Sequence, residues 1–96
     1  MSYLEPPRAK EKLRKITEFC RYASVYLGRQ IPWEIRDRLA DLWYEYIKEL
    51  PPEVVAREGI AIIGYPQIVL LKDIPRKIRE DPFFASLIIR WYGEMP

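Results

Sequence analysis

Side chains that usually carry catalytic chemistry are nearly missing from this chain of 96 residues. It contains no His and no Asn, a single Cys, one Thr and three Ser. Most enzymes that work near neutral pH use an imidazole, a thiol or an activated hydroxyl as the nucleophile or the proton carrier. We therefore expect that the protein is not an enzyme, that it has no catalytic residues and that it acts on no small-molecule substrate.

The same shortage excludes the common metal and phosphate sites. A zinc site usually takes Cys and His ligands, and Cys20 is the single residue of either type. Gly59 and Gly64 have the spacing of a phosphate-binding loop, but Tyr65 and Pro66 stand where that loop needs Lys and Ser or Thr. We expect no metal and no cofactor.

The sequence also lacks a long apolar run and a second cysteine. The lone Cys20 cannot form an intrachain disulfide, and the first residues show no basic region followed by an apolar core. The longest uncharged stretch, residues 59–71, is shorter than the roughly 20 residues that cross a bilayer. These features predict a cytoplasmic protein without a membrane partner.

Apolar residues make up 49% of the chain, and this content favours a folded protein over a disordered one. A chain of this length suits one small domain over residues 1–96, with residues 1–8 as an extended N-terminal arm. The lack of Asn and the abundance of Arg, Lys and Glu resemble the composition of small proteins from hyperthermophilic archaea and their viruses. That resemblance implies a thermophilic source and no residue roles.

Apolar periodicity predicts an antiparallel pair of helices in the first half of the chain. Residues 10–27 place their apolar side chains on one arc, and Gly28 follows where a left-handed residue ends a helix. A second amphipathic helix is expected to begin at Pro32, as its first residue, and to end before Pro51. Because the loop between them is short, the two helices should form an αα-hairpin.

The second half should contain a small hairpin and an apolar C-terminal helix. Two apolar runs, 60–63 and 68–71, flank a four-residue breaker and predict a β-hairpin of two buried strands, with a buried helical turn as the alternative. Residues 52–57 favour one short turn of helix and residues 75–79 a short basic turn. Asp81 as N-cap and Pro82 begin a helix that is apolar on nearly every side, which predicts burial all round. The fold class is mainly α.

The apolar surface of such a helix is larger than the core of a small domain can bury. Such a surplus is typical of an oligomer or partner interface. We therefore interpret the protein as a non-catalytic interaction module, a subunit, adaptor or homo-oligomer that buries its C-terminal helix against another chain. The residues expected at this interface are Arg36, Trp43, Tyr44, Phe83, Phe84, Ile88, Trp91 and Tyr92.

Arg36 stands out because it falls within the apolar arc of the second helix. One interpretation places its guanidinium against Trp33 or Trp43, or against a carboxylate at a contact surface. The alternative is an arginine at the rim of the core whose charged end reaches solvent.

Nucleic-acid binding is the second hypothesis, because helices followed by a hairpin are also the order of a winged helix. The segment in the recognition position, residues 52–58, carries mostly acidic charge, so contact through the phosphate backbone is the form to expect. The cations that would make it are Lys10, Arg14, Lys15, Arg21, Arg76, Lys77 and Arg79.

Four carboxylates recur every four residues along the second helix: Asp37, Asp41, Glu45 and Glu49. A cation site, an acid and base pair, and a dock for a basic partner are all conceivable for such a row. We favour a solvated face whose charges are paired, part of which faces the basic side of the first helix.

Overall fold

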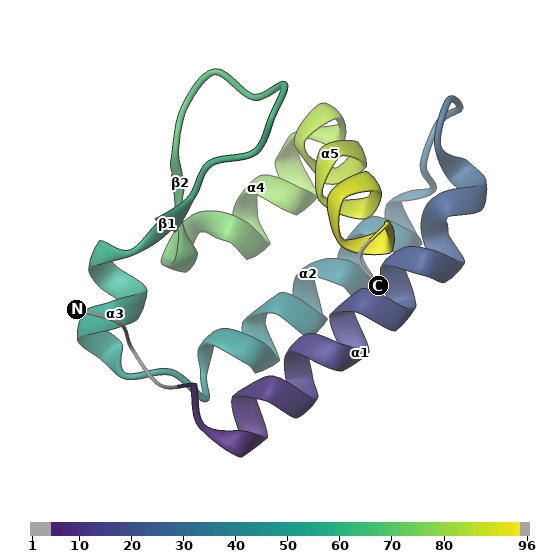
Figure 1. Cartoon of the computed structure of the whole chain (residues 1–96). Coiled ribbons are helices and arrows are strands. Elements are labelled where there is room, and N and C mark those ends of the chain that lie inside the picture. Colours follow the sequence, from purple (N-terminus) through teal and green to yellow (C-terminus); the bar gives the residue numbers. More distant parts are fainter. Residues whose placement is uncertain (1–4, 95–96) are drawn as a thin grey trace.

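The computed structural model describes residues 5–94, and most of these residues are helical (Figure 1). In chain order the elements are α1 (Pro7–Ala23), the 3-10 helix η1 (Ser24–Tyr26), α2 (Trp33–Ile47), α3 (Pro52–Arg57), β1 (Gly59–Ile60), β2 (Val69–Leu70), the 3-10 helix η2 (Leu71–Asp73), α4 (Ile74–Glu80) and α5 (Pro82–Gly93). The predicted fold class, mainly α with a small hairpin, is confirmed.

Helices α1 and α2 form the expected antiparallel pair, which Figure 1 shows along the lower side of the molecule. Gly28 has φ +84°, the left-handed value that was predicted where the first helix gives way to the loop. The helix ends differ from the prediction. Helix α1 already begins at Pro7, so Pro7 and Arg8 belong to the helix rather than to the expected arm, of which residues 1–4 lie outside the described residues.

Two further helix boundaries differ from those predicted. Helix α1 ends at Ala23, because the next three residues tighten into η1, where the Leu27 amide donates to the Ser24 carbonyl at 3.1 Å. Pro32 is the extended N-cap of α2, not its first helical residue, and its carbonyl accepts from the amides of Ile35 and Arg36. A proline cap leaves its side chain without a role in capping, so the backbone alone closes this helix end.

The core lies where α1 and α2 meet α4 and α5. Trp43 of α2 is 1% exposed and is one of the largest fully buried side chains. Its ring packs nearly perpendicular to those of Tyr46 and Tyr92, at centroid distances of 5.6 and 5.3 Å. Edge-to-face pairs of this kind add to the free energy of burial. Trp43 thereby joins the second helix to the last one.

Helix α5 begins as the sequence predicts. The side chain of Asp81 accepts hydrogen bonds from the amides of Phe83 and Phe84 at 3.1 and 3.2 Å, and Pro82 occupies the first helical position. At its other end the helix crosses α1 closely. A Cβ atom on Gly93 would lie 2.7 Å from the Ser24 hydroxyl oxygen and 3.1 Å from the Cys20 carbonyl oxygen.

The burial of α5 is less complete than its composition predicts. Helices α1 and α4 cover one face, on which Phe84 and Ile88 are 0% exposed. Two large side chains of α5 stay exposed, Phe83 at 54% and Trp91 at 44%. The expectation of burial on every side is therefore wrong for a single chain, because the loop between β1 and β2 covers Leu87 but not Trp91.

The hairpin is present but much shorter than predicted. Its antiparallel ladder holds two pairs, Gly59 with Leu70 and Ile60 with Val69. Residues 61–68 form a loop in which Gly64 has φ +101°, the value that the predicted turn requires. Ile63 is 82% exposed, so the prediction of two fully buried strands is wrong. Beyond the ladder the loop packs against α5, since a Cβ atom on Gly64 would lie 3.4 Å from the side chain of Leu87.

The close crossing of α1 and α5 can be tested by the sign of a change in the free energy of unfolding. Helix propensity alone would make Gly93→Ala more stable by up to about 1 kcal/mol. We expect instead a loss of about 1–3 kcal/mol in the free energy of unfolding, because the new methyl group overpacks the contact with α1. Chemical denaturation measures this change. Ser86→Ala in the same helix is the control, and a stabilised Gly93→Ala would contradict the close crossing.

Candidate functional site

Half of the predicted interface lies inside the chain's own core. Trp43, Phe84, Ile88 and Tyr92 are at most 9% exposed and contact residues of the same chain. They pack there because α1, α2 and α4 together offer enough apolar surface to enclose the inner face of α5. These four side chains are corrected from contact residues to core residues, and the surface of the single chain presents only Tyr44, Phe83 and Trp91 of the predicted aromatic set.

Arg36 makes an intramolecular contact that neither sequence interpretation foresaw. Its Nη1 atom donates to the carbonyl oxygen of Arg79 at 2.7 Å, at the C-terminal end of α4. Carbonyls at a helix end lack partners within the helix, and a cation there also favours the helix dipole. Arg36 therefore ties α2 to the end of α4.

The side chain of Arg79 makes the reciprocal link. Its Nε and Nη2 atoms donate to Asp37 at 2.7 Å and to Asp41 at 2.6 Å, both on α2. Hydrogen bonds to these two carboxylates raise the pKa of the Arg79 guanidinium, with Asp37 the larger cause. Two members of the carboxylate row thus serve the contact of α2 with α4.

The rest of the carboxylate row faces the first helix, as the sequence analysis favoured. Glu45 lies 3.9 Å from the Nζ atom of Lys12 and 3.2 Å from that of Lys48. Glu49 lies 3.7 Å from Arg8. Within residues 5–94, no group of three or more His, Cys, Asp or Glu side chains is arranged to hold a metal ion. The row is a paired, partly solvated face.

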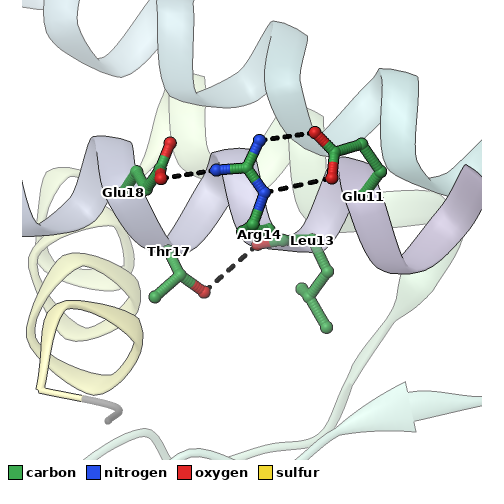
Figure 2. Close-up of polar contacts among 5 residues, drawn as sticks. All are labelled: Glu11, Leu13, Arg14, Thr17 and Glu18. Carbon is green, nitrogen blue, oxygen red and sulfur yellow. Dashed lines mark hydrogen bonds and ion pairs between the residues drawn. The ribbon is translucent and has the colours of Figure 1, made fainter.

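Among the cations proposed for nucleic-acid contact, Arg14 is already occupied. Figure 2 shows its guanidinium between two carboxylates of the same helix, bonded to both oxygens of Glu11 and to Glu18. Hydrogen bonding and charge from Glu11 come first among the causes that raise the pKa of Arg14 well above its usual range. An arginine held in this way would have to break its own ion pairs to reach a phosphate.

The basic turn of α4 is occupied as well. Arg76 pairs with Asp73 and Glu80, Arg79 pairs with α2, and the Nζ atom of Lys77 donates to the Tyr65 hydroxyl at 3.2 Å. Lys10 and Lys15 of α1 are exposed, and Arg21 has its own interaction within the chain. The structure therefore does not gather the seven proposed cations into one open basic surface.

Trp91, an exposed aromatic residue of α5, borders a groove. Leu87, Arg90, Trp91 and Glu94 of α5 and Ile62 and Ile63 of the hairpin loop line a hollow of about 210 Å³. Its floor is apolar, and two charged side chains of opposite sign stand at its edge. We call this groove with its lining the α5 face. Neither Arg90 nor Glu94 has an ion-pair partner within residues 5–94, although the two lie one turn apart on the same helix.

The loop that carries Ile63 is held in place at the corner of α4 and α5. The Tyr65 hydroxyl donates to Asp81 at 2.7 Å, and the Tyr65 ring packs against Phe84 at a centroid distance of 5.0 Å. Asp81 thus both caps α5 and anchors the loop. Partial burial raises the pKa of Asp81, but the hydrogen bonds from Tyr65 and from the capped amides outweigh it and lower the pKa.

Sequence reasoning missed the hairpin side of the α5 face. Ile63 was assigned to a buried strand, so its exposure was not anticipated. One signal was available: Arg90 and Glu94 are the charged residues next to Trp91, and they fall on the same side of the helix as Leu87. That spacing describes an outward face rather than a helix enclosed on all sides.

Two buried groups whose pKa values are raised offer no reactive side chain. Burial raises the pKa of the Cys20 thiol to about 12, and burial is also the main cause that raises the pKa of Tyr92 to about 12. Both stay protonated near neutral pH, and a protonated thiol is a poor nucleophile. These groups act as core residues.

No helix of the part of the chain that the structure describes combines the length and the apolar character needed to cross a membrane. A scan against protein-family models, a search of curated proteins and a search of solved structures found no match. The proposals below therefore rest on the geometry of this chain alone.

The contact made by Arg36 can be tested by truncation. We expect Arg36→Ala to lower the free energy of unfolding by about 1–2 kcal/mol, because the Arg79 carbonyl loses a charged donor. Arg38→Ala, an exposed arginine on the same helix, should change it by less than about 0.5 kcal/mol. Urea denaturation of both variants measures the difference, and equal values for the two would remove the structural role of Arg36.

The lowered pKa of Asp81 predicts a dependence of stability on pH. The ionised carboxylate stabilises the fold at neutral pH, and this contribution is lost as the pH falls through the folded pKa. Asp81→Ala should cost about 1–2 kcal/mol at pH 7 and less in acid. Asp81→Asn keeps a capping side chain, so it should cost less at pH 7 while removing the same pH dependence. Denaturation of the three proteins across acid pH measures both effects, and an unchanged pH dependence in Asp81→Asn would refute the assignment.

Proposed function

We propose that the protein is a small non-catalytic interaction module that forms a homodimer through the α5 face. The observation that carries the proposal is an apolar groove flanked by exposed Trp91 and Ile63, with an unpaired cation and an unpaired carboxylate at its edge. Single exposed apolar residues are normal on protein surfaces, but here two of them, Ile63 and Trp91, line the same groove. Tryptophan and arginine are also the residue types that contribute most to binding free energy.

The charged residues at the edge of the groove support a second copy of the chain as the partner that binds there. Arg14, Arg76 and Arg79 pair with carboxylates of their own chain. Arg90 and Glu94 have no ion pair within residues 5–94, which is also true of Arg38 and Arg57, but Arg90 and Glu94 border the apolar groove. A two-fold axis pairs one surface patch with itself, so two antiparallel α5 helices would bring Arg90 of each chain to Glu94 of the other. Such an arrangement satisfies both charges twice and encloses both Trp91 rings.

The residues that line the groove fit this arrangement in their spacing. Leu87 and Trp91 are four residues apart, as are Arg90 and Glu94, so each pair lies along one side of the helix. The apolar pair lies toward the hairpin loop and lines the groove with Ile63. A partner helix seated in that groove would contact apolar side chains on one flank and charges on the other.

The nucleic-acid alternative receives no such support. Its candidate cations on α4 are engaged with carboxylates or with Tyr65, and Arg14 is enclosed by two glutamates. A phosphate contact by Arg14, Arg76 or Arg79 would first require an internal ion pair to open, which offsets the electrostatic gain.

Charge reversal provides the test of the homodimer. We expect wild-type protein to dimerise in sedimentation equilibrium, and Arg90→Glu or Glu94→Arg to weaken dimerisation about tenfold or more, because each places like charges together twice. Mixing the two variants should restore association, since each opposite pair is then re-formed across the interface. The double variant Arg90→Glu/Glu94→Arg should also dimerise.

Trp33 offers a matched control for the aromatic contact. Trp91→Glu should abolish dimerisation, whereas Trp33→Glu, a change at a tryptophan that is 64% exposed and outside the α5 face, should leave it intact. Circular dichroism checks that both variants fold. Protein that stays monomeric at every concentration, or a dimer insensitive to Arg90→Glu, Glu94→Arg and Trp91→Glu, would overturn the proposal.

A further inference from the structure

A second hollow lies at the other end of α5, away from the α5 face. It measures about 370 Å³ and lies between the loop after α1, the first turns of α2 and the start of α5. Its lining residues are Gly28, Arg29, Gln30, Ile31, Arg36, Pro82, Phe83 and Ser86. This volume falls within the range of sites that bind small ligands. We call it the Arg29 pocket.

The charge of the Arg29 pocket is unbalanced. Two of its lining residues are arginines and none is a carboxylate. Neither Arg29 nor Arg36 has a carboxylate within ion-pair distance among residues 5–94, in contrast to Arg14, Arg76 and Arg79. Two guanidinium groups without a carboxylate partner on one concave surface attract an oxyanion, and the planar fork of Arg29 suits bidentate binding of phosphate.

Arg36 is already held in place before any ligand arrives. Its Nη1 atom is fixed on the Arg79 carbonyl, while its Nε atom is buried and has no hydrogen-bond partner in the described residues. Because the Nε atom is enclosed by protein, the Nη2 atom is the donor that this guanidinium can offer to an anion in the pocket. A fixed side chain also loses little conformational freedom on binding.

The remaining walls suit an aromatic ring joined to that anion. Phe83 is 54% exposed and offers a ring face for stacking. The Gln30 amide can both donate and accept, and the Ser86 hydroxyl, which donates to the Phe83 carbonyl, retains its capacity to accept. Bases of nucleotides stack on aromatic side chains and use such groups at their edges.

We propose that the Arg29 pocket binds one nucleotide, with the phosphate at Arg29 and Arg36 and the base against Phe83. A free nucleotide and one nucleotide of a single-stranded nucleic acid offer the same phosphate and base. The proposal is independent of the homodimer, because none of the residues that line the Arg29 pocket lines the α5 face.

Adenosine monophosphate, adenosine and inorganic phosphate are the probes of the first experiment. We expect adenosine monophosphate to shift the NMR signals of Gly28, Gln30 and Phe83, and to bind about tenfold more tightly than either fragment, since only it uses both halves of the pocket. Arg29→Glu should abolish binding, and Phe83→Leu should weaken it. Arg38→Glu, the same charge reversal at an exposed site on α2 that does not line the pocket, is the control.

Short oligoadenylates identify the source of the ligand. If an oligoadenylate binds more tightly than adenosine monophosphate and Arg29→Glu abolishes this binding, the site is supported and its ligand is a single strand. If the two bind equally, the site is supported and its ligand is the free nucleotide. Because Arg29 is exposed, its replacement should leave the fold intact, and circular dichroism checks this. Absence of shifts at these residues with millimolar adenosine monophosphate, or equal binding by Arg29→Glu and wild type, would overturn the proposal.

Discussion

Enclosure of Trp43 is the constraint on which the rest of the structure depends. A buried indole requires neighbours on all sides, and α2 alone cannot supply them, so Tyr92 of α5 closes over it. This requirement draws the inner face of α5 into the core together with Phe84 and Ile88. The apolar surplus of the sequence is thereby reduced to two exposed side chains of the same helix, Phe83 and Trp91.

Ion pairs also connect the helices at the surface of the protein. Arg79 joins α4 to two carboxylates of α2, and Lys12 and Arg8 of α1 face the remaining two. Single exposed pairs contribute little to stability. Other charged side chains of the described residues, Arg38 and Arg57 among them, also have no ion pair, so we take an unpaired charge to mark a site only where it borders a hollow. Arg90 with Glu94 marks the proposed homodimer contact, and Arg29 with Arg36 marks the proposed nucleotide pocket.

Contacts at the corner between α4 and α5 position residues of both proposed sites. Asp81 starts α5 and holds Tyr65, and through Tyr65 it holds the hairpin loop that places Ile63 beside the outer face of the helix. Phe83 follows Asp81 by two residues and lines the Arg29 pocket at the opposite end. A ladder of two residue pairs would not position such a loop by itself.

The sequence by itself determined the elements and their ends where a local signal existed. Apolar periodicity predicted α1 and α2, Asp81 with Pro82 predicted the start of α5, and Gly28 and Gly64 marked left-handed turns. Only the tertiary structure decided which apolar and charged side chains stay exposed. Ile63 and Ile62 are neighbours of equal hydrophobicity with opposite exposure, and Arg36 bonds to a carbonyl 43 residues away. Burial and pairing of this kind depend on contacts between distant segments, which no local pattern contains.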